Sequence, residues 1–289
     1  MAATTGTSGL LHRRPALRAG LLLAPPMLWL GVAYLGALAA LFVTAFWAQN
    51  SFTGDVERTW TLANFHDLVT IGVYRTIALR TLAIALLVTV VDAVIAFPVA
   101  LYMAKVASPR VQRLLVVAVL MPLWASYLVK AYAWRGMLGT GGLVSDLLKP
   151  FGLDTPGYGL TALVVTLAYL WLPYMVLPIY AGLERLPGSL LEASADLGAR
   201  NGTTLRRIVL PTVFPAFVAG SIFTFSLTMG DYIAVRIVGG PNQMLGNVVY
   251  DNVGAANNLP FAAAVATVPV VVMLVYLAAV RRTGALESL

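Results

Sequence analysis

The chain has 289 residues, of which 60% are hydrophobic and 11% are charged. Soluble globular domains contain about 25% charged residues, so this composition excludes an ordinary soluble domain. Cysteine is absent and the two histidines, His12 and His66, lie far apart, which excludes disulfides and thiolate sites and leaves no basis for predicting a metal centre.

Six apolar segments follow one another along the chain, each long enough to cross a hydrocarbon layer about 30 Å thick. They are Leu21–Trp47, Thr76–Met103, Leu114–Tyr132, Leu160–Leu183, Ile208–Met229 and Pro260–Val280. Backbone groups find no water partners inside a bilayer, so each segment is expected to be a helix. Five internal prolines predict kinks: Pro98, Pro122, Pro173, Pro178 and Pro215. The predicted fold class is an all-α membrane protein with six transmembrane helices.

The first apolar segment begins like a secretory signal, because a basic patch precedes Leu21. The apolar run is nearly 27 residues long, however, and a signal core has about 7–15 residues. We therefore expect a retained first helix after a cytoplasmic tail of residues 1–20.

Basic residues predict the orientation, because cytoplasmic flanks carry more of them. Twelve lie at one set of helix ends: Arg13, Arg14, Arg18, Lys105, Arg110, Arg113, Arg185, Arg200, Arg206, Arg207, Arg281 and Arg282. Seven lie at the other: Arg58, Arg75, Arg80, Lys130, Arg135, Lys149 and Arg236. Both termini are therefore predicted in the cytoplasm, and the loops 48–75 and 133–159 outside, where they form a rim facing a partner. The same distribution makes the net charge of +7 a sign of membrane topology and not of nucleic-acid binding.

A polar segment, residues 187–202, separates the fourth and fifth apolar segments. From Glu192 the sequence reads Glu-Ala-Ser-x3-Gly-x9-Ile-x-Leu-Pro, with defining residues Glu192, Ala193, Ser194, Gly198, Ile208, Leu210 and Pro211. This pattern resembles the cytoplasmic EAA loop of binding-protein-dependent ABC importer permeases. Ser194 stands where that family usually has alanine, a change from one small residue to another.

Local signals in this segment predict a helix of about two to three turns. Ser189 and Glu192 have the spacing of a capping box, and Gly198, or else Asn201 with Gly202, supplies a stop. Taken alone, the pattern also fits a capped helix that only links two spans. The resemblance instead implies a coupling helix that docks on an ATPase subunit, with Glu192 as its anchor and Gly198 as the point of close approach. Arg200 adds ionic contacts to that partner or serves only the membrane orientation.

The resemblance extends over roughly residues 60–283, within a transmembrane domain expected at 21–283 with its core at 75–283. Three segments look like the first permease subunit of spermidine/putrescine importers: Met121–Trp134, Leu172–Pro178 and Gly239–Asn247. The resemblance implies a polyamine as solute. Relatives that move ferric iron, thiosulfate or phosphonates share these motifs less faithfully, so those solutes remain alternatives.

Five residues are candidates for the solute path: Asp92, Trp124, Tyr127, Asp231 and Tyr232. A carboxylate at the depth of Asp92 costs about 2.5–3.5 kcal/mol to insert, so it is expected to face a cavity or a partner, or to be held at a helix interface. Asp231 beside Tyr232 suits an amine through charge and cation–π attraction of about 0.5–2 kcal/mol, and the alternative is a helix-end residue in water. Trp124 and Tyr127 line the path or belong to an interfacial aromatic belt.

The chain lacks the phosphate-binding sequence Gly-x4-Gly-Lys-Ser/Thr, so ATP and Mg²⁺ are expected on partner subunits, and no catalytic residue or cofactor is expected here. The resemblance implies a distinct second permease, two ATPase subunits and an extracytoplasmic solute-binding protein, assembled in a bacterial inner membrane. An ion-coupled secondary transporter using Asp92 is an alternative, but paired interrupted helices are not visible. An intramembrane enzyme is a second alternative, but no catalytic set of His, Ser/Lys or paired Asp residues is visible.

Overall fold

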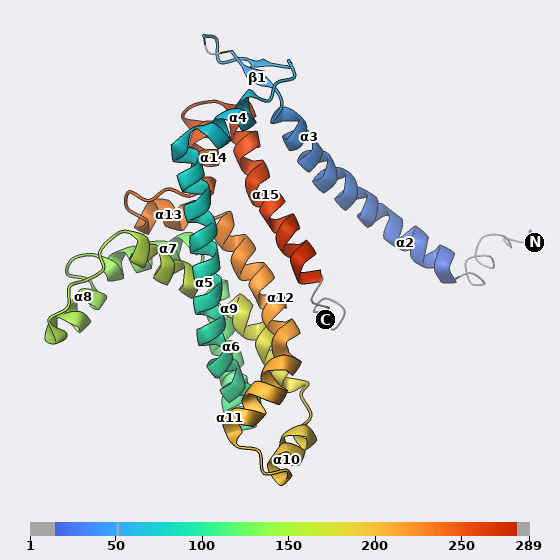
Figure 1. Cartoon of the computed structure of the whole chain (residues 1–289), viewed down its shortest axis with the longest axis vertical. Helices are drawn as coiled ribbons and strands as arrows, with labels where there is room; N and C mark the ends of the chain where they lie inside the picture. The colour runs from blue at the N-terminus through green and yellow to red at the C-terminus, as the bar shows by residue number, and fades with distance from the viewer. Residues whose placement is uncertain (1–14, 51, 282–289) are drawn as a thin grey trace, which may run out of the picture.

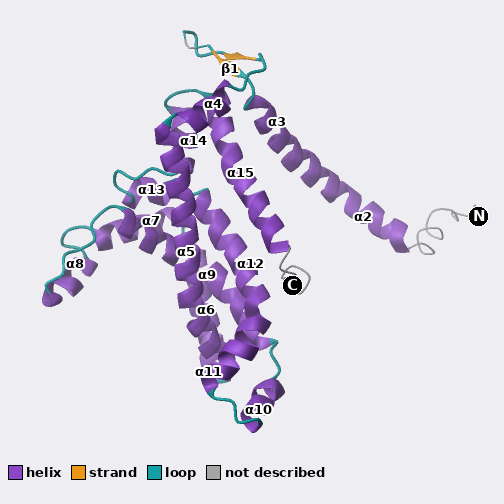
Figure 2. Ribbon diagram, viewed as in Figure 1, coloured by secondary structure: helices purple, strands orange, loops and turns teal. Residues whose placement is uncertain are grey.

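The computed structural model describes residues 15–50 and 52–281, and these are almost entirely helical (Figure 2). Residues 1–14 of the predicted cytoplasmic tail and the basic residue Arg282 lie outside the described residues. Five helices are long and apolar enough to cross a membrane: Leu22–Thr44, Gly72–Lys105, Leu160–Glu184, Asn201–Met229 and Leu259–Arg281. A sixth candidate is a bent pair of helices, so the all-α membrane fold is confirmed with five or six spans.

Three long helices form the centre of the molecule (Figure 1). They are α5 (Gly72–Lys105), α9 (Leu160–Glu184) and α12 (Leu210–Met229). Their buried side chains form two clusters at successive levels of the bundle, one around Val88 and Leu167 and the other around Ala100 and Ile179. All three helices continue through their prolines, because neighbouring helices and local adjustments satisfy the backbone groups that proline leaves free.

Glycines allow α9 and α12 to pack closely. A Cβ atom added at Gly182 of α9 would lie 2.7 Å from Ala216 Cβ, and one added at Gly220 of α12 would lie 2.7 Å from Met175 Sδ. Ala216 and Gly220 are four residues apart and therefore share one face of α12. Small residues at this spacing are typical of helix contacts in membranes, where packing replaces the hydrophobic effect as the driving force.

The third apolar segment departs from its prediction. A single helix over Leu114–Tyr132 is wrong, because α6 (Pro109–Trp124) and α7 (Tyr127–Leu138) meet at a bend of 96°. The bend lies at Ala125 and Ser126, whose ψ angles of 142° and 139° are extended and not helical. The short helices α8 (Leu143–Leu148) and η2 (Lys149–Phe151) prolong the arm that starts with α7.

The first span leaves the bundle (Figure 1). It consists of α2 (Pro15–Leu30), a π-helical turn η1 (Gly31–Leu35) and α3 (Gly36–Thr44), and no part of its apolar stretch is buried. Its contact with the bundle is between α3 and α15 (Leu259–Arg281). An apolar helix of this kind requires lipid or another chain around it, in agreement with a membrane-embedded subunit.

The remaining elements connect the long helices (Figure 1). One end of the bundle carries α10 (Gly188–Asp196), α11 (Asn201–Thr204) and the π-helical turn η3 (Leu205–Val209). Away from that end lie the other connecting elements: the strand pair β1 (Ala48–Gln49) and β2 (Val56–Glu57), α4 (Ala63–Thr70), α13 (Ile233–Val238) and α14 (Leu245–Gly254).

Candidate coupling loop and solute path

The polar segment 187–202 forms a short helix that projects from one end of the bundle (Figure 1). After α9 the chain extends at Pro187, with ψ 133°, and α10 runs for nine residues from Gly188. It ends before Gly198, whose φ of +74° lies in the left-handed region that favours glycine. Both the helix of two to three turns and the stop at Gly198 are confirmed.

The predicted capping box is wrong. The residue that precedes α10 is Pro187, and no side chain caps this helix. Ser189 is the second residue of α10 and not its cap, because the extended backbone of Pro187 lets the helix begin two residues earlier than the spacing of Ser189 and Glu192 suggests. The Glu192 carboxylate is therefore not bound to the start of its own helix and stays exposed.

The inner face of α10 is tied to the bundle. Ser194 is buried, and its Oγ lies 2.7 Å from Thr204 Oγ1 in a hydrogen bond that joins α10 to α11. Lys105, the last residue of α5, donates a hydrogen bond of 2.7 Å from Nζ to the carbonyl oxygen of Leu186, just before the loop. Ser194 thus makes a contact that the usual alanine could not make.

Between α10 and the bundle lies a cavity of about 440 Å³. It is lined by Leu101 and Lys105 of α5, by Leu186, and by residues of the loop and of η3: Leu191, Ala195, Ala199, Asn201, Gly202, Thr204, Leu205 and Val209. The loop therefore meets the bundle at a few discrete contacts and not over a fully packed face.

We expect Ser194→Ala and Thr204→Val to have similar effects, because both remove the Ser194–Thr204 hydrogen bond, and Thr204→Val additionally removes only a long bond of 3.5 Å to the Arg200 carbonyl oxygen. The loss amounts to about 1 kcal/mol for a bond of this type. Thermal unfolding of the purified variants and of the double variant tests this, and losses that add in the double variant would contradict it.

The outer face of α10 is exposed and partly apolar. Glu192 and Ala193 lie on the surface, and Leu197 at the end of the helix is 87% exposed. Exposed apolar side chains beside polar ones are typical of protein interaction sites. Beyond α10, Arg200 and Pro211 are exposed, while Ile208 and Leu210 are half-buried where the chain enters α12.

Asp92 lies at the centre of the bundle. Its side chain is 0% exposed, and neither carboxylate oxygen has a hydrogen-bond partner among the described residues. The other buried side-chain atoms without partners in that part of the chain lie on α9 and α12, in Thr166, Trp171 and Thr228. Among the described residues, the buried polar side chains that lack hydrogen-bond partners thus all lie on the three central helices.

Tyr127 and Asp231, 104 residues apart, are brought together by the bend between α6 and α7. The Tyr127 hydroxyl donates a hydrogen bond to Asp231 Oδ2, and the backbone N–H of Ala234 donates one of 2.9 Å to Oδ1. Asp231 is 7% exposed, so the prediction of a helix-end residue in water is wrong. Burial raises the pKa of Asp231, although the bonds from Tyr127 and from the backbone amides of α13 act in the opposite direction.

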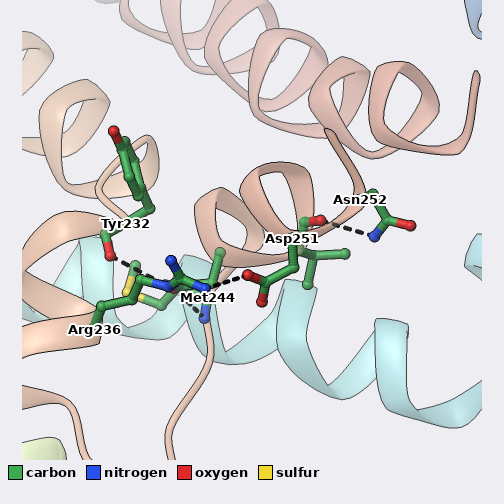
Figure 3. A network of polar contacts seen from close by, with 7 residues as sticks. Tyr232, Arg236, Met244, Asp251 and Asn252 are labelled. Atoms are coloured by element: carbon green, nitrogen blue, oxygen red, sulfur yellow. Dashed lines mark hydrogen bonds and ion pairs between the residues drawn. The ribbon is translucent and has the colours of Figure 1, made fainter. Parts of the chain in front are cut away.

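The other candidates of the path lie apart from this pair. Trp124, at the end of α6, is 79% exposed. The Tyr232 ring stacks on Tyr250 with 4.9 Å between centroids. Beside them Arg236 of α13 forms an ion pair with Asp251 of α14 (Figure 3). The sequence gives no signal for this pair, because the two residues lie on separate short helices and share no motif.

Comparisons with known proteins agree with this architecture. The family "Binding-protein-dependent transport system inner membrane component" matches residues 19–282. "Inner membrane ABC transporter permease protein YdcU" of Escherichia coli (strain K12) is 43% identical, over 98% of this chain and 95% of the relative. "Spermidine/putrescine transport system permease protein PotB" of the same organism is 32% identical, over 75% of this chain and 80% of the relative.

The fold has a solved counterpart in a bacterial alginate ABC transporter in complex with its alginate-bound periplasmic protein, with a TM-score of 0.73. The match covers 96% of this chain and 94% of that chain at 17% identity, which shows a common fold. This chain belongs to the family of binding-protein-dependent inner membrane transport components, as a multi-pass permease subunit of an ABC importer that is not itself the ATPase.

Proposed function

We propose that this chain receives the power stroke of an ATPase subunit at α10 and imports a small cationic solute of the polyamine class. The observation that carries the first half is the exposed outer face of α10, which presents Glu192, Ala193 and Leu197 beyond the bundle. Gly198 and Arg200 extend that docking face, and Ile208, Leu210 and Pro211 connect it to α12.

Three connections transmit a movement of α10 to the bundle. The Ser194–Thr204 bond links α10 to α11, the Lys105 bond links α5 to the start of the loop, and η3 joins the loop to α12. Through these contacts to α5 and α12, and through the chain that joins α9 to α10, a displaced α10 pulls on all three central helices. The cytoplasmic side is the side of α10, with both termini there, and the unburied first span contacts a distinct second permease or lipid.

The polyamine class rests on the 32% identity to PotB and on the acid and aromatic side chains near α13 and α14. Ferric iron, thiosulfate and phosphonate are the competing solutes. The test is uptake of labelled putrescine by cells that express the chain with its partner permease, ATPases and binding protein. We expect uptake that continues under an uncoupler and is outcompeted by spermidine. Uptake that is outcompeted only by one of the other solutes, or abolished by the uncoupler, would contradict the proposal.

Asp92 belongs to the proposed path although the described conformation closes it off. A buried polar group without a partner costs about 1–3 kcal/mol, so a protein that keeps one has a reason outside stability. We expect Asp92→Leu to raise the thermal stability of the purified subunit and to lower putrescine uptake. Asp92→Asn, with the same shape and no charge, separates the loss of charge from the loss of all polar atoms. Unchanged uptake by both variants would remove Asp92 from the path.

A further inference from the structure

The positively charged side chain of Arg236 on α13 contacts side chains of α14, away from the coupling loop (Figures 1 and 3). The Arg236 guanidinium lies 4.3 Å from the ring centroid of Tyr250 and pairs with the Asp251 carboxylate. The ring of Tyr232 stacks on the other ring at an interplanar angle of 20°. We call Tyr250 and Asp251, which contact this cation, together with Tyr232, which stacks on Tyr250, the α14 cage. An aromatic face with an adjacent carboxylate is the standard means by which proteins bind organic cations.

The contact between Arg236 and the α14 cage does not hold the two helices in place. The Asn247 Nδ2 atom donates a hydrogen bond of 3.1 Å to the carbonyl oxygen of Tyr232, and the Met244 backbone N–H donates one of 3.2 Å to Asn247 Oδ1. Asn247 and Met244 are buried. The first bond joins the start of α14 to the residue before α13, and the second caps α14, so both hold this region independently of the ion pair.

A second buried contact fixes α14 to the bundle. The backbone N–H of Leu245 donates a hydrogen bond of 3.0 Å to Thr81 Oγ1 on α5. By contrast the side chains of Arg236 and Asp251 remain 48% and 37% exposed. Water screens a pair with this exposure, so the pair adds little to stability and separates at low cost.

We infer that the α14 cage binds an ammonium group of the cationic solute, and that Arg236 is a tethered cation which the solute displaces. The inference rests on the proposed function, since it takes the polyamine class as given. A primary ammonium carries three hydrogen-bond donors and a compact charge, so it satisfies the Asp251 carboxylate and the Tyr250 ring face as the guanidinium does. The solute gains contacts that already exist in the free protein, and Arg236 moves into water.

Two substitutions distinguish a displaceable cation from a structural latch, because the two roles predict different directions of change in solute affinity. If the pair were a latch, Arg236→Gln and Asp251→Asn would break the same contact and have the same consequence. In the α14 cage the first removes the competitor of the solute and the second removes its counter-charge. Solute affinity then rises in one variant and falls in the other.

The experiment measures binding of radiolabelled putrescine to the whole complex of both permeases and the ATPases, in lipid nanodiscs without the solute-binding protein. We expect Arg236→Gln to bind putrescine about fivefold more tightly than wild type and Asp251→Asn about fivefold more weakly, as fits the loss of one exposed cation contact. Arg236→Lys keeps a tethered cation and is expected to match wild type. Asn252→Ala, at the next position of α14, serves as the matched control, and uncharged butane-1,4-diol is expected not to compete.

Several results overturn the inference. Shifts of both variants in the same direction identify a latch. Altered ATPase stimulation by the binding protein with unchanged putrescine affinity identifies a contact for that protein. If the wild-type complex still imports putrescine in either case, the proposed function stands and only the α14 cage is refuted. If neither wild type nor Arg236→Gln binds putrescine and the complex imports another solute, the polyamine class and the α14 cage fail together.

Discussion

We expect solute uptake to fall to background when Gly198 is replaced by leucine or Glu192 by arginine, while the permease still inserts into the membrane. Gly198 has a φ of +74°, and no atom lies within 4 Å of a Cβ added there. The left-handed backbone costs a leucine about 1–2 kcal/mol, which a folded subunit tolerates. The larger effect arises because the added side chain projects where an ATPase subunit has to approach. Glu192→Arg reverses the charge of the exposed anchor on the same helix.

Three controls separate docking from strain. Gly141 has a φ of +78° and equally open space, but it lies in the turn between α7 and α8. Gly141→Leu therefore carries the same backbone strain outside the coupling loop, in the rim predicted to face a different partner, and is expected to leave co-purification of the ATPase subunits at the wild-type level. Gly198→Asn keeps the left-handed backbone with a smaller side chain and is expected to fall between wild type and leucine. Glu192→Gln removes the charge without reversing it.

The measurements are ATP-driven uptake, the amount of permease in the membrane fraction and co-purification of the ATPase subunits. We expect the Gly198→Leu and Glu192→Arg permeases to be present in the membrane without bound ATPase. Normal uptake by both variants would refute the docking role of α10. Loss of the permease from the membrane would instead show that the loop is needed for folding.

Most of the membrane fold could be predicted from the sequence, because long apolar runs determine it. Five predicted segments agree with the spans of the structure to within a few residues at most ends, and the largest difference is the start of the fifth, at Asn201 and not at Ile208. The bend at Ala125 and Ser126 could not be predicted, since two residues with extended backbone interrupt an apolar run without changing its hydrophobicity. The unburied first span could not be predicted either, because hydrophobicity does not distinguish a helix packed on its own chain from one that leaves it.

The candidate site was predictable only where it is local in sequence. The short helix and the stop at Gly198 depend on neighbouring residues and are confirmed. The contact of Tyr127 with Asp231 depends on the bend after α6. The sequence therefore indicates both residues as candidates but does not predict that they contact each other. The α14 cage depends on how α13 and α14 meet, which one sequence does not reveal.

We expect Gly182→Ala to weaken the packing between α9 and α12 next to the coupling loop, and Ala216→Gly in the same chain to restore that packing. An alanine Cβ at Gly182 would lie 2.7 Å from Ala216 Cβ and 3.4 Å from Val213 Cγ1. The β-carbon of Ala216 is fixed to the α12 backbone, so the two helices have to move apart. Overpacking of this kind costs about 1–3 kcal/mol. In the double variant the single Cβ between the helices is supplied by α9 in place of α12, so most of the loss is recovered.

Thermal unfolding of the purified permease in detergent measures the effect, and Gly136→Ala on α7 is the matched control, since no atom lies within 4 Å of its added Cβ. Function should follow stability here, because α9 leads into the coupling loop and α12 leads out of it. When these helices separate, movement of α10 is absorbed at the junction, and we expect less solute imported per ATP hydrolysed. A double variant as unstable as Gly182→Ala alone would show that the two β-carbons do not share one space, and close α9–α12 packing would no longer explain how the loop is held.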